Sequence, residues 1–198
     1  MIWSLKNLEK FLTENGVDIS KWGTGEAKTV QHLLKELIKK ECEINVVDGK
    51  VVRKVSALSI NVLYKNEVLK EEYQRFKDGR IRRRRMDCSV AEKITEDEVS
   101  DINTAAKRAI KEELQISISD NQIGEILHME RTRASGSYPD TIMDMVLYKC
   151  DVILEYNQYH PYGYIEHQED KDTFFIWVDR TTLKKHGWVR ESKLTKNN

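Results

Sequence analysis

The sequence contains few of the residues that interrupt or cross-link a chain, with two prolines and three cysteines among 198 residues. Proline is too scarce to form a proline-rich linker. Cys42, Cys88 and Cys150 are isolated, so the chain has no Cys-x-x-Cys motif for a metal or a redox pair. An odd number of isolated cysteines favours buried free thiols over a disulfide framework, which fits a reducing cytoplasm.

Long apolar runs and an excess of one charge are also absent. No segment approaches the roughly 20 apolar residues of a transmembrane helix, and the N-terminus lacks the apolar core of a signal peptide. The 33 basic and 33 acidic residues give a formal net charge of zero, so no global field attracts nucleic acid or an anionic membrane. The length suits one well-buried domain with a small appendage.

The first fifty residues predict a helical extension. Leu5, Leu8, Phe11 and Leu12 have helical spacing and precede an Asn-Gly stop signal, and a second amphipathic helix is expected over residues 29–42. The Gly-rich segment 23–29 lacks the spacing of a P-loop, and no strand leads into it. We therefore expect residues 1–50 to pack on a core domain, residues 51–198, or to support a dimer interface. An Asp-Gly hairpin turn at positions 48–49 would join the two parts.

The core domain reads as strands, then a helix, then strands. Residues 55–64 alternate with period two, as a half-buried strand does. A polar turn over 65–67 leads to a return strand over 68–76. After the helix, apolar strand-like runs follow at 143–154 and 173–178.

The most informative segment is the helix that ends near residue 116. Ile102, Ala105, Ala106, Ala109 and Ile110 recur with the helical period. A pair of glutamates follows at 112 and 113, on one flank of this apolar stripe. A solvated surface helix with an Arg108–Glu112 ion pair is the plain interpretation. A carboxylate pair at a helix end that holds a divalent cation is the functional one.

This segment resembles the second half of the Nudix box, Arg-Glu-aliphatic-x-Glu-Glu-x-Gly-aliphatic. The matching residues are Arg108, Ile110, Glu112, Glu113 and Ile116, and the departures are Ala109 and Gln115. Upstream, the family's glutamate falls on Ser100 and its glycine on Ile94. Glu98 matches if the preceding loop carries two extra residues.

The resemblance, which spans roughly residues 51–190, implies an α+β fold, an α/β/α sandwich with a mixed sheet between helices. It implies hydrolysis of a nucleoside diphosphate linked to another moiety, with Mg²⁺ or Mn²⁺ as cofactor. Glu112, Glu113 and Glu98 would be the metal ligands, and Arg108 would orient an acid. Ala109 replaces a glutamate that serves the family as ligand or base. Such a group contributes a factor of about 10² to 10⁴.

Other acids are candidates to replace the missing glutamate. Glu169 lies in an acidic stretch with Glu166, Asp170 and Asp172, where family members often keep a loop acid. A solvated acidic loop is the plain alternative. Ser137 and Tyr138 lie where the family keeps a substrate-facing loop, and the tyrosine would stack on a base. A tyrosine that serves only in packing is the plain alternative.

A run of five arginines within positions 80–85 is the remaining feature. As a strand, it would direct Arg82 and Arg84 to one face, where planar guanidinium groups suit phosphate. An exposed strand that pairs with local acids is the plain interpretation. Nucleic acid is an unlikely partner, because the charge is balanced and no aromatic residue interrupts the run.

Three hypotheses follow. The chain is a metal-dependent pyrophosphohydrolase with an altered acid set, a catalytically silent Nudix-like module that binds a nucleotide-like ligand or a protein, or a nucleic-acid binder. The first is favoured, because Arg108, Glu112 and Glu113 occur together. Homodimers are frequent in the family, so a second copy of the chain is an expected partner.

Overall fold

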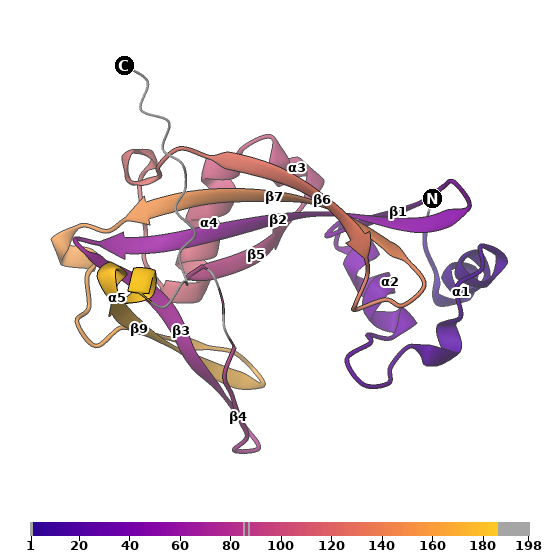
Figure 1. Cartoon of the computed structure of the whole chain (residues 1–198), viewed down its shortest axis with the longest axis horizontal. Coiled ribbons are helices and arrows are strands. Elements are labelled where there is room, and N and C mark those ends of the chain that lie inside the picture. The colour runs from indigo at the N-terminus through magenta and orange to yellow at the C-terminus, as the bar shows by residue number, and fades with distance from the viewer. Residues whose placement is uncertain (1, 85, 87, 186–198) are drawn as a thin grey trace. The chain divides into compact units, whose positions relative to one another are not determined.

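A computed structural model describes residues 2–84, 86 and 88–185 of the chain (Figure 1). The described residues form α1 (Leu5–Glu14), α2 (Val30–Ile38), α3 (Glu96–Val99), α4 (Ile102–Leu114) and α5 (Arg180–Lys185). Their strands are β1 (Glu43–Val47), β2 (Lys50–Tyr64), β3 (Glu67–Phe76), β4 (Ile81–Arg82), β5 (Val90–Ile94), β6 (Leu127–Ala134), β7 (Ile142–Ile153), β8 (Tyr164–His167) and β9 (Lys171–Asp179). Short 3₁₀ helices are η1 (Ile19–Lys21), η2 (Asp120–Gln122) and η3 (Tyr156–Gln158).

The described strands belong to one sheet with the order β6-β7-β2-β3-β9-β8; β1 and β5 pair with β2, and β4 pairs with β3. The pairs β6–β7, β2–β3, β3–β9 and β8–β9 are antiparallel. In contrast, β2 and β7 are neighbours that run in the same direction in Figure 1. The sheet is therefore mixed, and the predicted α+β class is confirmed.

The chain folds into two compact units. Unit 1 contains residues 1–58, 92–105 and 126–149, and unit 2 contains residues 59–91, 106–125 and 150–198. Each unit thus combines segments that are distant in sequence. The domain division predicted at residue 50 stays a prediction.

The core of unit 1 joins the N-terminal helices to strands. Leu8 and Leu12 of α1, Leu33 of α2, Ile44 of β1 and Val51 of β2 belong to one buried cluster. Figure 1 shows α1 and α2 close to the β1–β2 hairpin. The helices form as predicted because their apolar residues recur on one side, and the α1 and α2 helices are capped by Ser4 and Thr29.

The turns follow the local chemistry of the chain. In the β1–β2 hairpin, Val47 pairs with Lys50, and Asp48 and Gly49 both have positive φ angles, of 48° and 72°. This is the geometry of a type I′ turn, for which Asp-Gly is a preferred pair. The hairpin expected at residues 48–49 is confirmed.

Unit 2 is built on the antiparallel pair β3–β9. Their register runs from Glu67 opposite Asp179 to Phe76 opposite Lys171, with an irregularity between Glu71 and Tyr73. Leu63, Val68 and the partly buried Val178 pack together beside this pair. The strands expected over 68–76 and 173–178 are therefore present, although β9 begins two residues earlier.

Some predicted boundaries are wrong. The second helix ends at Ile38, rather than Cys42, because Lys39 is its C-cap and Lys40 has a φ of 56°. Ile123 forms an isolated bridge with Val152, and β6 begins four residues later at Leu127. The short strands β5 and β8 have too few residues to show a clear period in the sequence.

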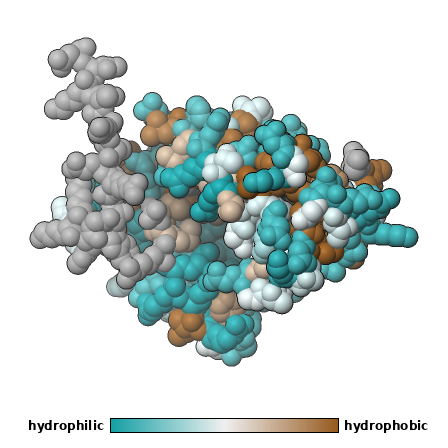
Figure 2. Space-filling model, turned by 45° about the vertical axis from the view of Figure 1, so that its right-hand side comes forward, coloured by the Kyte–Doolittle hydropathy of each residue, from teal (hydrophilic) through white to brown (hydrophobic). Residues whose placement is uncertain are grey.

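Cys42, Cys88 and Cys150 are free thiols and buried, as expected. Burial raises the pKa of the Cys42 and Cys150 thiols to about 11, so both are inert at neutral pH. The face drawn in Figure 2 is mostly hydrophilic, with smaller separate hydrophobic areas. Among the described helices, none is both long enough and apolar enough to cross a membrane.

Candidate functional site

The motif helix α4 buries its apolar side completely. Ala105, Ala106, Ala109 and Ile110 have no exposed surface, and Leu114 is 4% exposed. Position 109, where the Nudix box has a glutamate, therefore faces the protein core. A carboxylate at this position would be desolvated unless the packing around it changed.

Arg108 and Glu112 form the ion pair that their spacing predicts. The Arg108 Nη1 atom donates to the Glu112 Oε2 atom at 2.7 Å, and the glutamate side chain is 56% exposed. An exposed i,i+4 pair of this kind contributes only a few tenths of a kcal/mol to stability. Its main effect is to orient one oxygen of Glu112 along the helix.

The helix ends with the backbone shape that the Nudix box requires. Gln115 has a φ of 61°, and its N–H donates to the Lys111 carbonyl at 3.1 Å. Left-handed backbone after a helix favours glycine, which the family has at this position. Gln115 therefore keeps the turn geometry at some cost in backbone strain, and buried Ile116 follows as in the motif.

Arg84 connects the motif to a buried acid in unit 2. Its Nε atom donates to the Glu71 Oε1 atom at 2.9 Å, its Nη2 atom pairs with the other carboxylate oxygen, and the Glu71 side chain is 2% exposed. Glu71, and more weakly Glu113, raise the pKa of Arg84. Arg84 thus interacts with the predicted metal ligand Glu113 and with a carboxylate that the sequence did not single out.

The surroundings of Glu71 are polar and buried. Gln74 is 1% exposed and its Nε2 atom lies 3.5 Å from the Glu71 Oε2 atom, while Thr173 is the register partner of Gln74. Within the described part of the chain, Gln74 Oε1 and Thr173 Oγ1 are buried without a hydrogen-bond partner. Unpaired buried polar atoms are uncommon, and they concentrate at functional or strained positions.

The arginine run forms a strand for only two residues, Ile81–Arg82. The strand alternation that would place Arg82 and Arg84 on one face does not continue to Arg84. Arg82 is exposed on β4, whereas Arg84 is half-buried against Glu71. The other described arginines of the run pair locally, Arg80 with Asp78 at 2.7 Å and Arg83 with Glu72 at 3.7 Å.

The predicted additional acids, Glu98 and Glu169, belong to different units. Glu98 belongs to unit 1, where its Oε2 atom accepts from the Thr95 N–H at 2.9 Å and caps α3. Glu169 is exposed between β8 and β9. Its neighbour Asp172 is the acid that is held in place, by Arg75, Lys77 and His167. Bonds from His167 and then Arg75 hold the pKa of Asp172 far below its ordinary value.

The expected substrate-facing loop requires a correction. Ser137 and Tyr138 lie in unit 1, and Tyr138 has no exposed surface because it packs in the N-terminal core, with its ring 5.0 Å from that of Trp22. A side chain buried in this way cannot stack on a nucleobase. Ser137 uses its carbonyl to accept from the Lys28 N–H at 2.8 Å, which ties the loop to the start of α2.

The acids present fit only one manner of metal binding. Among the described residues, no group of three or more acidic, histidine or cysteine side chains is arranged to hold a metal ion. Mg²⁺ commonly binds through one or two carboxylates and completes its shell with water and substrate phosphates. The pair Glu112 and Glu113 suits a cation that arrives with a phosphorylated substrate, rather than a metal that is resident in a protein cage.

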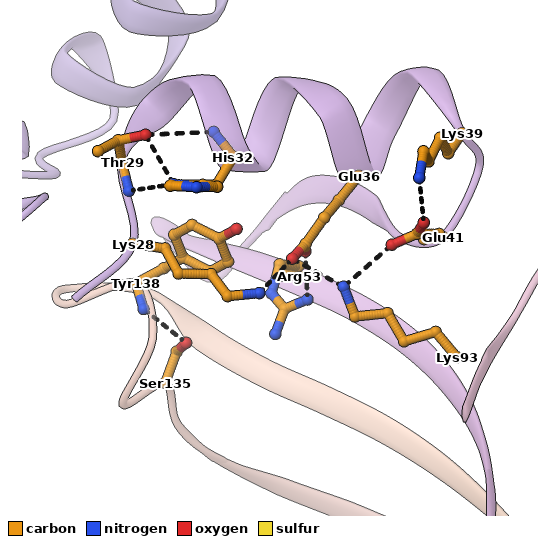
Figure 3. A network of polar contacts seen from close by, with 10 residues as sticks. All are labelled: Lys28, Thr29, His32, Glu36, Lys39, Glu41, Arg53, Lys93, Ser135 and Tyr138. Carbon is orange, nitrogen blue, oxygen red and sulfur yellow. Dashed lines mark hydrogen bonds and ion pairs between the residues drawn. The ribbon is translucent and has the colours of Figure 1, made fainter. Parts of the chain in front are cut away.

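Unit 1 contains a second charged cluster, centred on Glu36 of α2 (Figure 3). Lys28 and Lys93 reach its Oε1 atom at 2.8 and 2.7 Å, and Arg53 reaches its Oε2 atom at 3.1 Å. Burial opposes ionisation of Glu36, but Lys28 and Lys93 outweigh it and hold its pKa at about 2. The Arg53 guanidinium also lies 5.0 Å from the centroid of the Tyr138 ring.

This cluster explains the conformation of the glycine-rich segment. Lys28 points to Glu36, and Thr29 caps α2 through a reciprocal bond with His32 (Figure 3). The segment is thus a helix start supported by an ion pair. Sequence reasoning missed Glu36 and Glu71. The signals were that Glu36 lies three residues after buried Leu33 in α2, and Glu71 two residues after buried Leu69 in β3.

Comparisons with known proteins give structural likeness only. No protein-family model matches the chain, and no curated protein matches its sequence. A MutT/nudix family protein from Enterococcus faecalis is 13% identical, with a TM-score of 0.40, over 89% of this chain and 57% of that protein. The Ap4A hydrolase of C. elegans is 14% identical, with a TM-score of 0.33, over 65% of this chain and 83% of its own length. A NUDIX family hydrolase from Clostridium perfringens is 12% identical, with a TM-score of 0.33, over 66% of this chain and 84% of that protein. The chain thus spans little more than half of the Enterococcus faecalis protein.

Proposed function

We propose that the chain hydrolyses a nucleoside diphosphate linked to another moiety, taken up as its Mg²⁺ or Mn²⁺ complex, with an altered set of acids. The observation that supports this most is that partly exposed Arg84 is held by buried Glu71, while the charge of Glu113 also raises the pKa of Arg84. A guanidinium next to a carboxylate at a helix end offers complementary groups for a phosphate and for its metal ion.

Each group has a distinct part in this proposal. Glu112 and Glu113 would share the cation with the diphosphate oxygens. Arg84, whose side chain is 36% exposed, would turn part of its planar fork to a phosphate. Glu71 is hydrogen-bonded to Arg84, and it would hold the arginine in position.

The altered acid set predicts slow turnover. Ala109 supplies no base, and its position is fully buried. Loss of a general base typically costs a factor of about 10² to 10⁴ in rate. Glu169, which is exposed in unit 2, remains the proposed candidate for the third acid, whereas Glu98 belongs to unit 1.

A second candidate function is a module that binds the same ligand without cleaving it. The sealed position of Ala109 and the ion pair between Arg108 and Glu112 favour this alternative. Such a module would retain phosphate binding through Arg84 and lose only the step that activates water.

The two functions differ in turnover. The full chain is incubated with nucleoside diphosphates joined to a sugar, to a second nucleoside or to further phosphates, with Mg²⁺ or Mn²⁺, and products are separated by chromatography. Metal-dependent cleavage that is lost in Glu113→Gln and kept in Glu125→Gln supports hydrolysis, because Glu125 is an exposed acid outside the motif. Binding measured by calorimetry without cleavage supports the module, and the absence of both refutes the two proposals.

A further inference from the structure

The outer face of the β3–β9 pair in unit 2 carries two stacked aromatic rings. Tyr73 and Phe174 are opposite each other in the register, with ring centroids 4.5 Å apart and ring planes inclined by 20°. Both residues are partly exposed, whereas the adjacent register pair Gln74 and Thr173 is buried. Strand alternation therefore puts the rings on the face opposite the buried polar pair.

Arginines cover these two rings. The Arg83 guanidinium lies 5.4 Å from the centroid of Tyr73, and that of Arg75 lies 5.0 Å from the centroid of Phe174. The Arg83 and Arg75 side chains are 66% and 53% exposed. We call Tyr73, Arg75, Arg83 and Phe174 the arginine–aromatic face.

The segment that contributes Tyr73, Arg75 and Arg83 is rich in basic residues although the whole chain is neutral. Residues 70–85 contain eight basic and three acidic side chains, and Asp172 of β9 pairs with Arg75 and Lys77. Among the described residues, Arg83 pairs with Glu72 alone, at 3.7 Å, and exposed pairs of this type contribute little and exchange easily with other anions. Arg75 is held more closely, by Asp172 at 3.0 Å. Arg82 is exposed and makes no ion pair with the described residues.

The sequence alone argued against a nucleic-acid surface, because no aromatic residue interrupts the arginine run. In the folded chain, the pairing of β3 with β9 places aromatic side chains from outside the run beside its arginines. Tyr73 comes from β3, and Phe174 comes from β9, about ninety positions beyond the run. Rings under arginines on an exposed sheet face are the combination that binds single strands, in which bases stack on rings and cations follow the backbone.

We propose that the arginine–aromatic face binds single-stranded nucleic acid. A base takes the place of a guanidinium on Tyr73 or Phe174, and the displaced arginine moves to the adjacent phosphate. The exchange is favourable because stacking of a base on an aromatic side chain is stronger than an exposed cation–π contact. A duplex binds more weakly, since its bases are already stacked and paired. This inference is independent of the proposed hydrolase, because none of these four residues belongs to that site.

The test uses the full chain and fluorescently labelled decamers of oligouridylate and oligothymidylate, followed by fluorescence polarisation from low to moderate salt. We expect affinity that falls steeply with salt, since each phosphate contact contributes about 0.7 to the slope for a single strand. Arg83→Gln and Arg82→Gln should lower both the affinity and the slope. Arg131→Gln on β6, an exposed arginine in unit 1, is the matched control and should leave both unchanged.

Variants of the rings separate stacking from charge. Tyr73→Leu and Phe174→Leu should each weaken binding by about 5- to 100-fold without a change in the salt slope. Tyr73→Phe keeps the ring and should bind like the parent, which also controls for folding, together with circular dichroism. The proposal is overturned if oligonucleotides do not bind, if both leucine variants bind like the parent, or if the chain binds vesicles of anionic phospholipid and not oligonucleotides.

Discussion

Each unit buries one glutamate against cations, and the two arrangements differ in what they leave exposed. In unit 1, Glu36 is shared by Lys28, Arg53 and Lys93, and Arg53 is itself buried. In unit 2, Glu71 takes both hydrogen bonds from a single arginine, Arg84, whose side chain is 36% exposed. In the first arrangement the guanidinium is sealed, since the Arg53 side chain is 7% exposed, although the Lys28 side chain remains 43% exposed. The second holds a guanidinium that a ligand can still reach.

The largest expected effect is on the free energy of unfolding, when Glu36 of unit 1 loses its charge. Glu36→Gln should lower the free energy of unfolding by about 3–5 kcal/mol, because it leaves buried Arg53 and two lysines without their counter-charge. Denaturant unfolding measures the change. Glu26→Gln, at an exposed position near the start of α2, is the control and should stay within about 0.5 kcal/mol of the parent. An effect below 1 kcal/mol would remove the structural role assigned to Glu36.

The pH dependence of stability tests whether the charge of Glu36 stabilises the fold. Because the folded pKa of Glu36 is about 2 and its ordinary value is 4.5, its contribution is complete above the ordinary value and lost as the pH falls toward 2. The loss should amount to about 3 kcal/mol, at 1.36 kcal/mol per pKa unit. The stability difference between the parent and Glu36→Gln should therefore shrink over this range. A difference that stays constant with pH would contradict the charge-based explanation.

Glu71→Gln should destabilise less, by about 1–3 kcal/mol, because partly exposed Arg84 can recover water when it loses its charged partner. The neighbouring Glu72→Gln is the matched control, since its ion pair with Arg83 is long and exposed. Thermal unfolding of both variants measures the difference. A cost for Glu71→Gln equal to that of Glu36→Gln would break the contrast between the two units.

The smallest effect is expected at Tyr138, above the Glu36 cluster. Its hydroxyl is buried without a hydrogen bond among the described residues, and burial and the charge of Glu36 raise its pKa well above the ordinary value. Tyr138→Phe should therefore change the free energy of unfolding by less than about 1 kcal/mol. Tyr138→Leu removes the ring beneath Arg53 and should cost more, and equal costs would show that the ring contributes nothing.

Local pattern predicted the elements better than their ends. The helix at 102–114 and the strand at 67–76 appear where period and turn signals placed them, whereas β2 begins at Lys50, five residues before the strand predicted over 55–64. The alternation that makes residues 68–76 a strand also puts Glu71 on the same side as buried Leu69. The alternation was therefore a signal that Glu71 is buried. The partner of Glu71, Arg84, follows β4 and was expected on an exposed strand.

Among the predicted site residues, the contacts that depend on local spacing were predicted correctly, and the burial that depends on distant segments was not. The Arg108–Glu112 pair needs only helical spacing, so the sequence was sufficient. Tyr138 was predicted to contact a ligand because its segment lies where the resembled family keeps a substrate-facing loop. Its burial depends on Trp22 and α2, more than a hundred residues earlier, which no local pattern reveals.

The sequence by itself determined the helical and strand periods, the Asp48–Gly49 turn and the motif with its alanine at position 109, because these depend on neighbours within a few residues. Tertiary structure alone decided that position 109 is sealed, that Arg84 meets Glu71, and that Tyr73 and Phe174 lie beneath arginines. These depend on strand register and on burial. Both are set by contacts between distant segments, which form only when the whole chain excludes water from its core.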